Sequence, residues 1–325
     1  MPCPAPVIFL IFRRPELTAQ VFEVIRQAQP KQLLVVADGP RDPAEAVLCE
    51  QARAVTERID WDCQVFRNYA EANMGCRDRV SSGISWAFGQ VEEAIILEDD
   101  CLPHPSFFTY CSALLERYRH DERVMAISGD NFQNGQRRTP YSYYFSKYPH
   151  CWGWATWRRA WRHWQFKPEV WLEFRDSGLM PQVCGDADEA QFWHRIFDRA
   201  FLQGQPNTWG YPWTLACWAQ GGLTALPEVN LVSNIGFAAG ATHTNKITAE
   251  AGLAVAELGP LVHSPFVVRH READRYTFDH HFCGIPVADG TLFTELKQQG
   301  LQLKRQLKLL ISRSVDCLRG CLKSP

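Results

Sequence analysis

Short apolar runs alternate along the chain with longer segments in which apolar residues recur every three or four positions. Residues 7–12, 33–37, 63–66 and 94–97 are the short runs, and their length is typical of strands buried on both faces of a parallel sheet. Segments 16–28, 43–59 and 76–92 have the spacing of helices that pack one face on a sheet. The alternation predicts an α/β fold with a doubly wound, mostly parallel central sheet flanked by helices.

The fourth apolar run leads directly into three acids, Glu98, Asp99 and Asp100. Pro103 and Pro105 end regular structure soon afterwards, which places the acids at the carboxyl end of a central strand. Ligands bind at that edge of open α/β sheets. Three adjacent carboxylates repel one another unless a positive charge neutralises them, so this acid triplet favours a divalent cation over the alternative, a solvated acidic turn.

Other polar residues follow the first three apolar runs. These residues are Arg13, Asp38 and Arg67. Because the carboxyl ends of parallel strands lie at one edge of the sheet, we expect these side chains to converge there. A carboxylate there can accept hydrogen bonds from a base or ribose, and arginines bind phosphate in a bidentate way. Each residue alone fits a turn or a surface position, but together they predict a nucleoside diphosphate bridged to a metal. No glycine-rich phosphate loop is present, which disfavours phosphate-loop kinases and dinucleotide oxidoreductases.

Composition narrows the class of protein further. Among 325 residues, 46% are hydrophobic and the formal net charge is -2, so we expect a folded protein that does not bind nucleic acid. The 12 cysteines include no CxxC pair, which favours reduced thiols in a cytoplasmic protein. A zinc site at residues 280–283 is a weaker alternative, because no second cluster of ligands matches it. Residues 7–12 are too short for a signal peptide, and no segment is long enough to span a membrane.

The order of several motifs carries a resemblance to a known family. FLIFRRPE, VVADGPR, NMGCRDRVSSGISWAF, ILEDD and NLVSNIGF together resemble the family-2-like nucleotide-diphospho-sugar transferases of GT-A fold. The resemblance covers residues 5–245 and assigns roles to the triplet. Asp100 would hold Mn²⁺ or Mg²⁺, Asp99 would contact the ribose and Glu98 the donor sugar. The residues that would line the nucleotide pocket are Arg13, Arg14, Asp38, Arg67 and Arg79, and Asp38 would bind the nucleobase.

Tryptophans crowd the second half of the chain. Most of them are expected in the core, but Trp152 and Trp154 flank Gly153, and a glycine permits close approach of an acceptor sugar that stacks on aromatic rings. His243 follows a glycine-containing stretch and could complete the shell of the cation or donate to phosphate. A structural role is the alternative for this histidine.

The expected catalytic base is missing from its usual place. The relatives typically carry an aspartate after the first tryptophan of the segment written here TWGYPW, where this chain has Gly210. An inverting transfer needs a base, and the candidates are Asp186, Asp188 and Glu189. Their alternative role is to complement the dipole of a helix that begins near Gly185.

We therefore expect three regions: a nucleotide-sugar-binding half (1–130), an acceptor-binding half (131–260) and a helical C-terminal extension (261–325). The basic, amphipathic segment 291–325 could lie on the inner face of a membrane or dock on its own domain. The predicted activity is metal-dependent hexosyl transfer from a UDP-sugar to a glycan or glycolipid acceptor in polysaccharide biosynthesis. A sugar-1-phosphate nucleotidyltransferase and an inactive sugar-binding relative are the alternatives.

Overall fold

The four apolar runs of the sequence form neighbouring strands of one large sheet. The computed structural model describes residues 3–236 and 252–282. Contacts divide the chain into units 1–284 and 285–325, and the described residues all belong to the first. The described strands are β1 (Val7–Ile11), β2 (Gln32–Ala37), β3 (Gln64–Tyr69), β4 (Glu93–Glu98), β5 (Cys101–Pro103), β6 (Val124–Ser128), β7 (Tyr143–Ser146), β8 (Trp154–Trp157), β9 (Leu223–Pro227) and β10 (Val232–Asn234).

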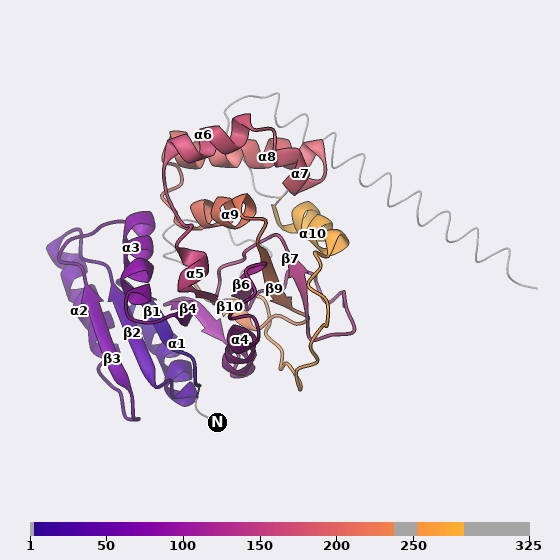
Figure 1. Cartoon of the computed structure of the whole chain (residues 1–325). Helices are drawn as coiled ribbons and strands as arrows, with labels where there is room; N and C mark the ends of the chain where they lie inside the picture. The colour runs from indigo at the N-terminus through magenta and orange to yellow at the C-terminus, as the bar shows by residue number, and fades with distance from the viewer. Residues whose placement is uncertain (1–2, 237–251, 283–325) are drawn as a thin grey trace, which may run out of the picture. The chain divides into compact units, whose positions relative to one another are not determined.

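Eight of these strands form the central sheet in the order β3-β2-β1-β4-β8-β6-β9-β7 (Figure 1). Strands β3, β2, β1 and β4 run parallel, β8 is antiparallel to both of its neighbours, and β7 is antiparallel to β9. In the parallel half, Leu10 pairs with Glu98 and Ile11 with Ala37. The chain therefore leaves β1, β2 and β4 at the same edge of the sheet, as the sequence predicted.

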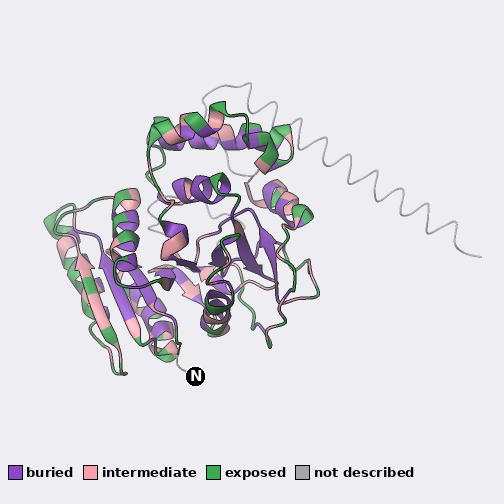
Figure 2. Cartoon of the chain, viewed as in Figure 1, coloured by how far each residue is buried: buried purple, intermediate pink, exposed green. Residues whose placement is uncertain are grey.

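Helices cover both faces of this parallel half. The helical segments are α1 (Pro15–Ala28), α2 (Pro43–Val55), α3 (Cys76–Phe88), α4 (Ser106–Arg117), α5 (Arg158–Trp161), α6 (Pro168–Asp176), α7 (Met180–Cys184), α8 (Ala187–Phe197), η1 (Asp198–Leu202), α9 (Gly210–Ala219), α10 (Arg271–Thr277) and η2 (Phe278–Phe282). Leu33 and Val35 of β2 share a core cluster with Val21 of α1, whereas the alternate residue Val36 faces Gly83 of α3. Side chains alternate between the two faces of a strand, so both faces are buried and the sheet is doubly wound (Figure 2).

Three predicted elements have different ends in the structure. The third strand was expected over 63–66 but extends to Tyr69, so Arg67 lies inside β3 and pairs with Val35. Helix α2 ends at Val55, where the Thr56 hydroxyl donates to the Arg53 carbonyl oxygen at 2.7 Å. Helix α3 ends at Phe88, before Gly89. The sequence predicted too early an end because Arg67 and Asn68 are polar. Strand β3 lies at the edge of the sheet, where polar side chains are tolerated that a buried strand would exclude.

The segment 262–282 returns to the second half of the sheet. The Ser142 amide donates to the Val262 carbonyl oxygen at 2.9 Å, and the His270 amide donates to the Phe145 carbonyl oxygen at 2.7 Å. These bonds cover β7, which lies at the edge of the sheet and would otherwise expose unpaired backbone groups. Residues 262–282 therefore pack with the second half. Residues 283–325 of the predicted extension, which include the segment 291–325, lie outside the described residues. His243 also lies outside them.

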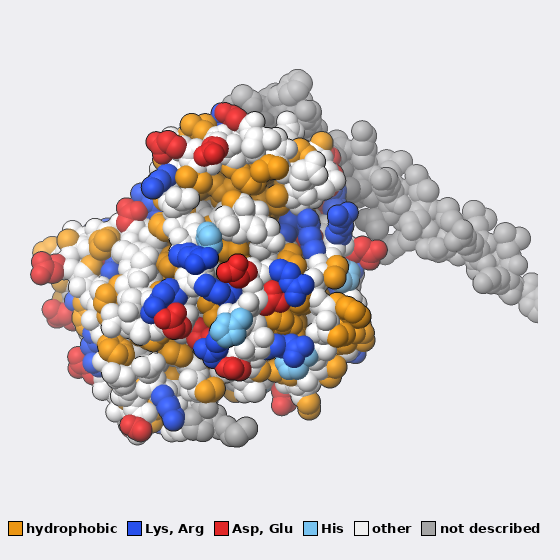
Figure 3. Space-filling model, viewed as in Figure 1, with side chains coloured by type: hydrophobic (Ala, Val, Ile, Leu, Met, Phe, Trp, Pro, Cys, Tyr) orange, Lys and Arg blue, Asp and Glu red, His pale blue; other side chains and the backbone are white. Residues whose placement is uncertain are grey.

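The cysteines in the described part of the chain are all free, and Cys101, Cys111 and Cys217 are buried. Basic and acidic side chains are intermixed on the face that Figure 3 shows, in keeping with the small net charge. None of the described helices is both long and apolar enough to cross a membrane.

Candidate functional site

A cavity of about 520 Å³ opens at the carboxyl edge of β1, β2 and β4. It lies where the chain leaves the parallel strands, between that edge and the N-terminus of α3. The predicted site residues that line it are Arg14, Asp38, Arg79, Glu98, Asp99, Asp100 and Trp152. Residues from five separate parts of the sequence therefore meet at one cavity. Of the strand-end residues that were expected to converge, Asp38 and the acid triplet line it.

Arg14 is the counter-ion of the acid triplet. Its Nη1 atom lies 2.9 Å from Asp100 Oδ2, and its Nη2 atom pairs with Asp99 Oδ1. Burial alone would lower the pKa of the Arg14 guanidinium, but the charges of Asp99 and Asp100 outweigh it and raise that pKa. The side chain of Asp99 is only 3% exposed, and its Oδ2 atom also accepts from the Phe12 amide at 3.3 Å. Asp99 therefore holds Arg14 and β1 together, and the ribose contact implied by the resemblance would compete with those bonds.

Glu98 is the least neutralised member of the triplet. In the described part of the chain, no cation forms an ion pair with it, whereas Asp99 and Asp100 share Arg14. Burial raises the pKa of Glu98, and the charges of Asp100 and Asp99 raise it further. The charge of Arg14 opposes this rise in pKa, and so does a hydrogen bond between the Trp209 side chain and this carboxylate. Trp209 lines the cavity, a position that the sequence did not indicate, because the departure from the family pattern lies at the next residue, Gly210.

Asp38 shapes the cavity rather than offering a free carboxylate. Its Oδ1 atom accepts from the amides of Gly39 (2.8 Å) and Met74 (2.9 Å). Its Oδ2 atom accepts from Asn73 Nδ2 (3.0 Å) and the Gly75 amide (3.2 Å). A carboxylate has about four acceptor positions, and all of them are used here. Asp38 thus anchors the loop that starts α3, and the predicted contact of its carboxylate with the nucleotide base would require breaking one of these bonds.

The other predicted arginines are spread over different environments. Arg79 is buried and donates to the Ala37 carbonyl oxygen at 3.1 Å and to Asn68 Oδ1 at 2.8 Å, so it ties together the ends of β2 and β3. Arg13 pairs with Glu45 of α2. Arg67 points to the Thr56 carbonyl oxygen at 3.5 Å. Neither Arg13 nor Arg67 lines the cavity, so the structure does not bring these two to the site predicted for the nucleotide.

The two candidate acceptor tryptophans have different surroundings. Trp152 is half-buried and lines the cavity, and its amide donates to the buried Asp130 carboxylate at 3.0 Å. Trp154 is 1% exposed and stacks on Trp209 at 5.3 Å in the core. The structure does not place Trp154 at the cavity, because Trp154 begins β8 and its ring packs on Trp209 in the interior.

Gly153 has a structural role that the sequence did not reveal. Its φ angle is 65°, and an added Cβ would lie 2.6 Å from a side-chain carbon of Val232. A glycine is therefore needed for a left-handed backbone and for packing against β10. The close approach is to another part of the protein, and not to a ligand as predicted.

The NLVSNIGF motif closes the site beside the acid triplet. Strand β10 pairs with β5, which brings Asn234 opposite Cys101, and the Ile235 amide donates to the Asp100 carbonyl oxygen at 2.8 Å. A Cβ added to Gly236 would lie 2.3 Å from Asp100 Oδ2. Gly236 thus leaves the room in which the Asp100 carboxylate faces the cavity. Its proximity to the triplet could not be deduced from the sequence, where about 130 residues separate the two.

The chemistry of the cavity fits a hard divalent cation only if the ligand supplies part of the coordination. No group of three or more His, Cys, Asp or Glu side chains is arranged to hold a metal within the described ranges. Asp100 and Glu98 nevertheless place two carboxylates on the cavity wall. Mg²⁺ is commonly bound by one or two carboxylates together with phosphate oxygens and water, so the donor set fits a cation that arrives with a diphosphate.

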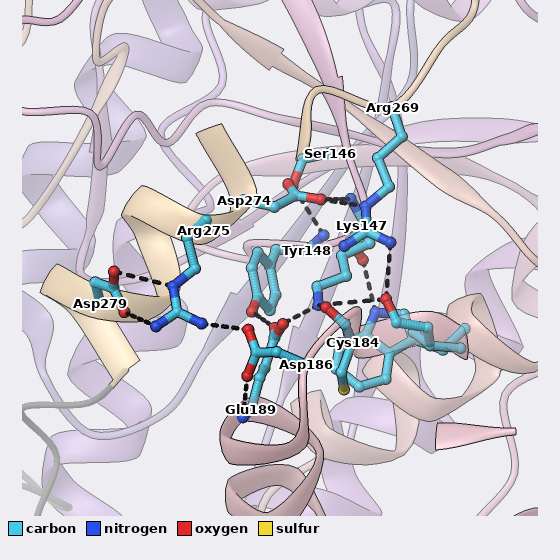
Figure 4. Close-up of polar contacts among 12 residues, drawn as sticks. Ser146, Lys147, Tyr148, Cys184, Asp186, Glu189, Arg269, Asp274, Arg275 and Asp279 are labelled. Carbon is cyan, nitrogen blue, oxygen red and sulfur yellow. Dashed lines mark hydrogen bonds and ion pairs between the residues drawn. The ribbon is translucent and has the colours of Figure 1, made fainter. Parts of the chain in front are cut away.

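The predicted catalytic acids belong to a different cluster, shown in Figure 4. Glu189 is buried and binds Lys147 and the Tyr148 hydroxyl. Asp186 caps α8 by accepting from the Glu189 amide at 2.8 Å and pairs with Arg275. Both line a second cavity of about 390 Å³ that shares no residue with the first, and Asp188 is exposed on α8. The structure therefore does not bring these acids to the acid triplet. All three lie at the start of α8, where the alternative, that they complement the helix dipole, places them, and Asp186 also caps the helix.

Comparisons with known proteins add little to this geometry. No family model matches the chain, and no curated protein matches it. Among solved structures, the chain resembles UDP-glucose pyrophosphorylase in complex with UDP-glucose, with a TM-score of 0.29 and 10% identity over 50% of this chain and 81% of that chain. So weak a likeness decides neither the fold nor the function. The central sheet itself defines an α/β protein, with a cavity lined by charged residues at the carboxyl edge of its parallel strands.

Proposed function

We propose that the chain is a metal-dependent glycosyltransferase that moves a sugar from a nucleoside diphosphate, most suitably UDP, to a hydroxyl group of a glycan or glycolipid. The observation that carries the proposal is the acid triplet with Arg14 on the wall of a cavity at the carboxyl edge of parallel strands. A volume of about 520 Å³ lies within the range of small-molecule sites, roughly 300 to 1,000 Å³. The motif resemblance supports the sugar donor.

Each residue at the cavity has a role in this proposal. Arg14 would bind the diphosphate, for which its planar group is suited. Asp100 would hold Mn²⁺ or Mg²⁺ together with phosphate oxygens, and the bound cation would offset the charge that develops on the leaving diphosphate. Glu98, oriented by Trp209, would face the donor sugar. Asp99 would act by fixing Arg14.

The acceptor would enter beside Trp152. This ring is half-buried on the cavity wall, and the Asp130 carboxylate fixes its backbone. An indole face can stack on the apolar face of a sugar. A glycolipid acceptor reached at the inner face of a membrane through segment 291–325 belongs to the same proposal.

Calorimetry with UDP in the presence of Mn²⁺ tests the donor site. We expect the wild-type chain to bind UDP and Asp100→Ala to bind it at least about tenfold more weakly, a difference of about 1.4 kcal/mol. Asp188→Asn is the matched control, because it removes an exposed acid outside the cavity, and its affinity should equal that of the wild type. Equal affinity in the wild type and Asp100→Ala would reject the metal assignment.

The reaction class needs separate assays. A glycosyltransferase should slowly hydrolyse its UDP-sugar and release UDP. A nucleotidyltransferase should instead release pyrophosphate from UTP and a sugar 1-phosphate. Binding of UDP-sugar with no turnover in either assay would identify an inactive sugar-binding protein and reject the proposed activity.

A further inference from the structure

The proposed donor site contains a positively charged side chain, Arg14. The two carboxylates that pair with this arginine are not equivalent. Asp99 makes two contacts with Arg14, through Nη2 and, at 3.4 Å, through Nε, and its side chain is 3% exposed. Asp100 makes one ion pair, at 2.9 Å, and its side chain is 15% exposed. Asp99 is thus the fixed partner of Arg14, and Asp100 is the partner that a ligand can reach.

The backbone of Arg14 is held while its side chain reaches the cavity. Its carbonyl oxygen accepts from the Thr18 amide at 2.9 Å and from the Thr18 hydroxyl at 2.8 Å at the start of α1. The side chain is 25% exposed and lines the cavity. A small rotation of the guanidinium can therefore exchange Asp100 for another anion without moving β1 or α1.

We propose that Arg14 makes this site select a complex of a divalent cation with a nucleoside diphosphate over the free cation. The inference rests on the proposed function. A free cation that takes Asp100 would leave the mostly buried guanidinium with one anionic partner fewer, which is unfavourable. A diphosphate returns anionic oxygens to Arg14, to which a guanidinium binds strongly. The Asp100 carboxylate leaves Arg14 and binds the cation only when a phosphate group takes the place of Asp100 on Arg14.

This exchange makes the two ligands depend on each other. Because coupling between binding sites is reciprocal, the diphosphate should strengthen binding of the cation, and the cation should strengthen binding of the diphosphate. Removal of Arg14 should have opposite effects on the two ligands. Asp100 would become available to a free cation, while the diphosphate would lose its arginine. A residue that only supported the fold would weaken both.

Electron paramagnetic resonance of free Mn²⁺ measures the first effect, and calorimetry with UDP at saturating Mn²⁺ measures the second. We expect Arg14→Gln to bind Mn²⁺ alone about tenfold more tightly than the wild type and UDP at least about tenfold more weakly. Arg14→Lys, which keeps the charge but not the fork, should retain weak binding of Mn²⁺ alone. Arg13→Gln is the matched control, because Arg13 pairs with Glu45 and does not line the cavity, and it should change neither affinity.

The outcomes separate this inference from the proposed function. If Arg14→Gln binds Mn²⁺ alone no more tightly than the wild type, the inference is overturned even where the wild type binds UDP with Mn²⁺. If the gain appears and is lost again in the double variant Arg14→Gln/Asp100→Ala, competition for Asp100 is supported. If the wild type does not bind UDP with Mn²⁺, the proposed function fails, and the inference falls with it. Thermal unfolding of each variant, measured by circular dichroism, confirms that it is folded.

Discussion

Two clusters of charged residues in this protein have similar chemistry and opposite organisation. In the acid triplet, Asp99 and Asp100 share one arginine beside an open cavity, and Glu98 has no ion pair within the described residues. In the second cluster (the Lys147 network), each carboxylate contacts a cation: Glu189 with Lys147, Asp274 with Arg269, and both Asp186 and Asp279 with Arg275.

The difference shows why one group of acids suits a ligand and the other suits the fold. Lys147 is 3% exposed and also donates to the carbonyl oxygens of Val183 and Cys184, both at 3.4 Å. Asp274 of α10 accepts from Ser146 Oγ at 2.5 Å. The Lys147 network thus joins β7, α7, α8 and α10 with few unused polar groups (Figure 4). The incompletely paired charge of the triplet suits the proposed cation, whereas the paired charges of the Lys147 network hold segments of the fold together.

The largest expected effect of a single substitution is on folding, at Lys147. Lys147→Met would leave the buried Glu189 carboxylate without its cation, which should lower the free energy of unfolding by about 3 kcal/mol. Chemical denaturation measures this change, and adding Glu189→Gln should recover part of it. Arg26→Met, which breaks an exposed pair with Glu23, is the control and should alter stability little. A loss of UDP affinity without a loss of stability in Lys147→Met would contradict the division between the two clusters.

The next effect is on ligand binding, at Gly236. Gly236→Ala adds a Cβ that would lie 2.3 Å from Asp100 Oδ2, so the carboxylate must move. We expect UDP affinity in the presence of Mn²⁺ to fall by about tenfold, with little change in the melting temperature. Gly259→Ala is the matched control, since no described atom lies within 4 Å of the added Cβ. Unchanged affinity in Gly236→Ala would mean that Asp100 does not hold the cation.

At Gly210, the first residue of α9, a substitution should change the stability only slightly and the reaction rate more. An added Cβ would make ordinary contacts with Thr208 Oγ1 at 3.7 Å and Cys151 Sγ at 3.8 Å, and both of these residues line the cavity. Gly210→Asp should stabilise the protein by about 0.5 kcal/mol, because an acid in the first turn complements the helix dipole. If this position lacks only a base, UDP-sugar hydrolysis should rise by about tenfold or more.

The isosteric Gly210→Asn variant separates shape from proton transfer. It places an amide in the same space but cannot act as a base, so its hydrolysis rate should stay at the wild-type level. Equal rates in the Asp and Asn variants would show that the chemistry of this chain does not depend on a base at position 210.

The parallel half of the sheet could be predicted because its strands are continuous apolar runs, and the position of the acid triplet followed from the strand that precedes it. The partner of the triplet could not be predicted, because Arg13 and Arg14 are adjacent and only the start of α1 decides which faces the cavity. Asp186 and Glu189 were misplaced because acids at the start of a helix suit capping and buried ion pairs as well as catalysis, and the sequence did not show that Lys147 pairs with Glu189. Trp152 and Trp154 are alike in sequence, and only the strand that begins at Trp154 buries one and leaves the other at the cavity.

The return of residues 262–282 to the sheet edge has a consequence for any shortened form of this protein. A fragment that stops near residue 260 would lack the backbone that shields β7 and would also lose Arg269 and Asp274 from around Lys147. Its bare strand could then add to the same strand of another copy. We therefore expect such fragments to self-associate, so the smallest piece suited to crystallisation should extend at least to Phe282.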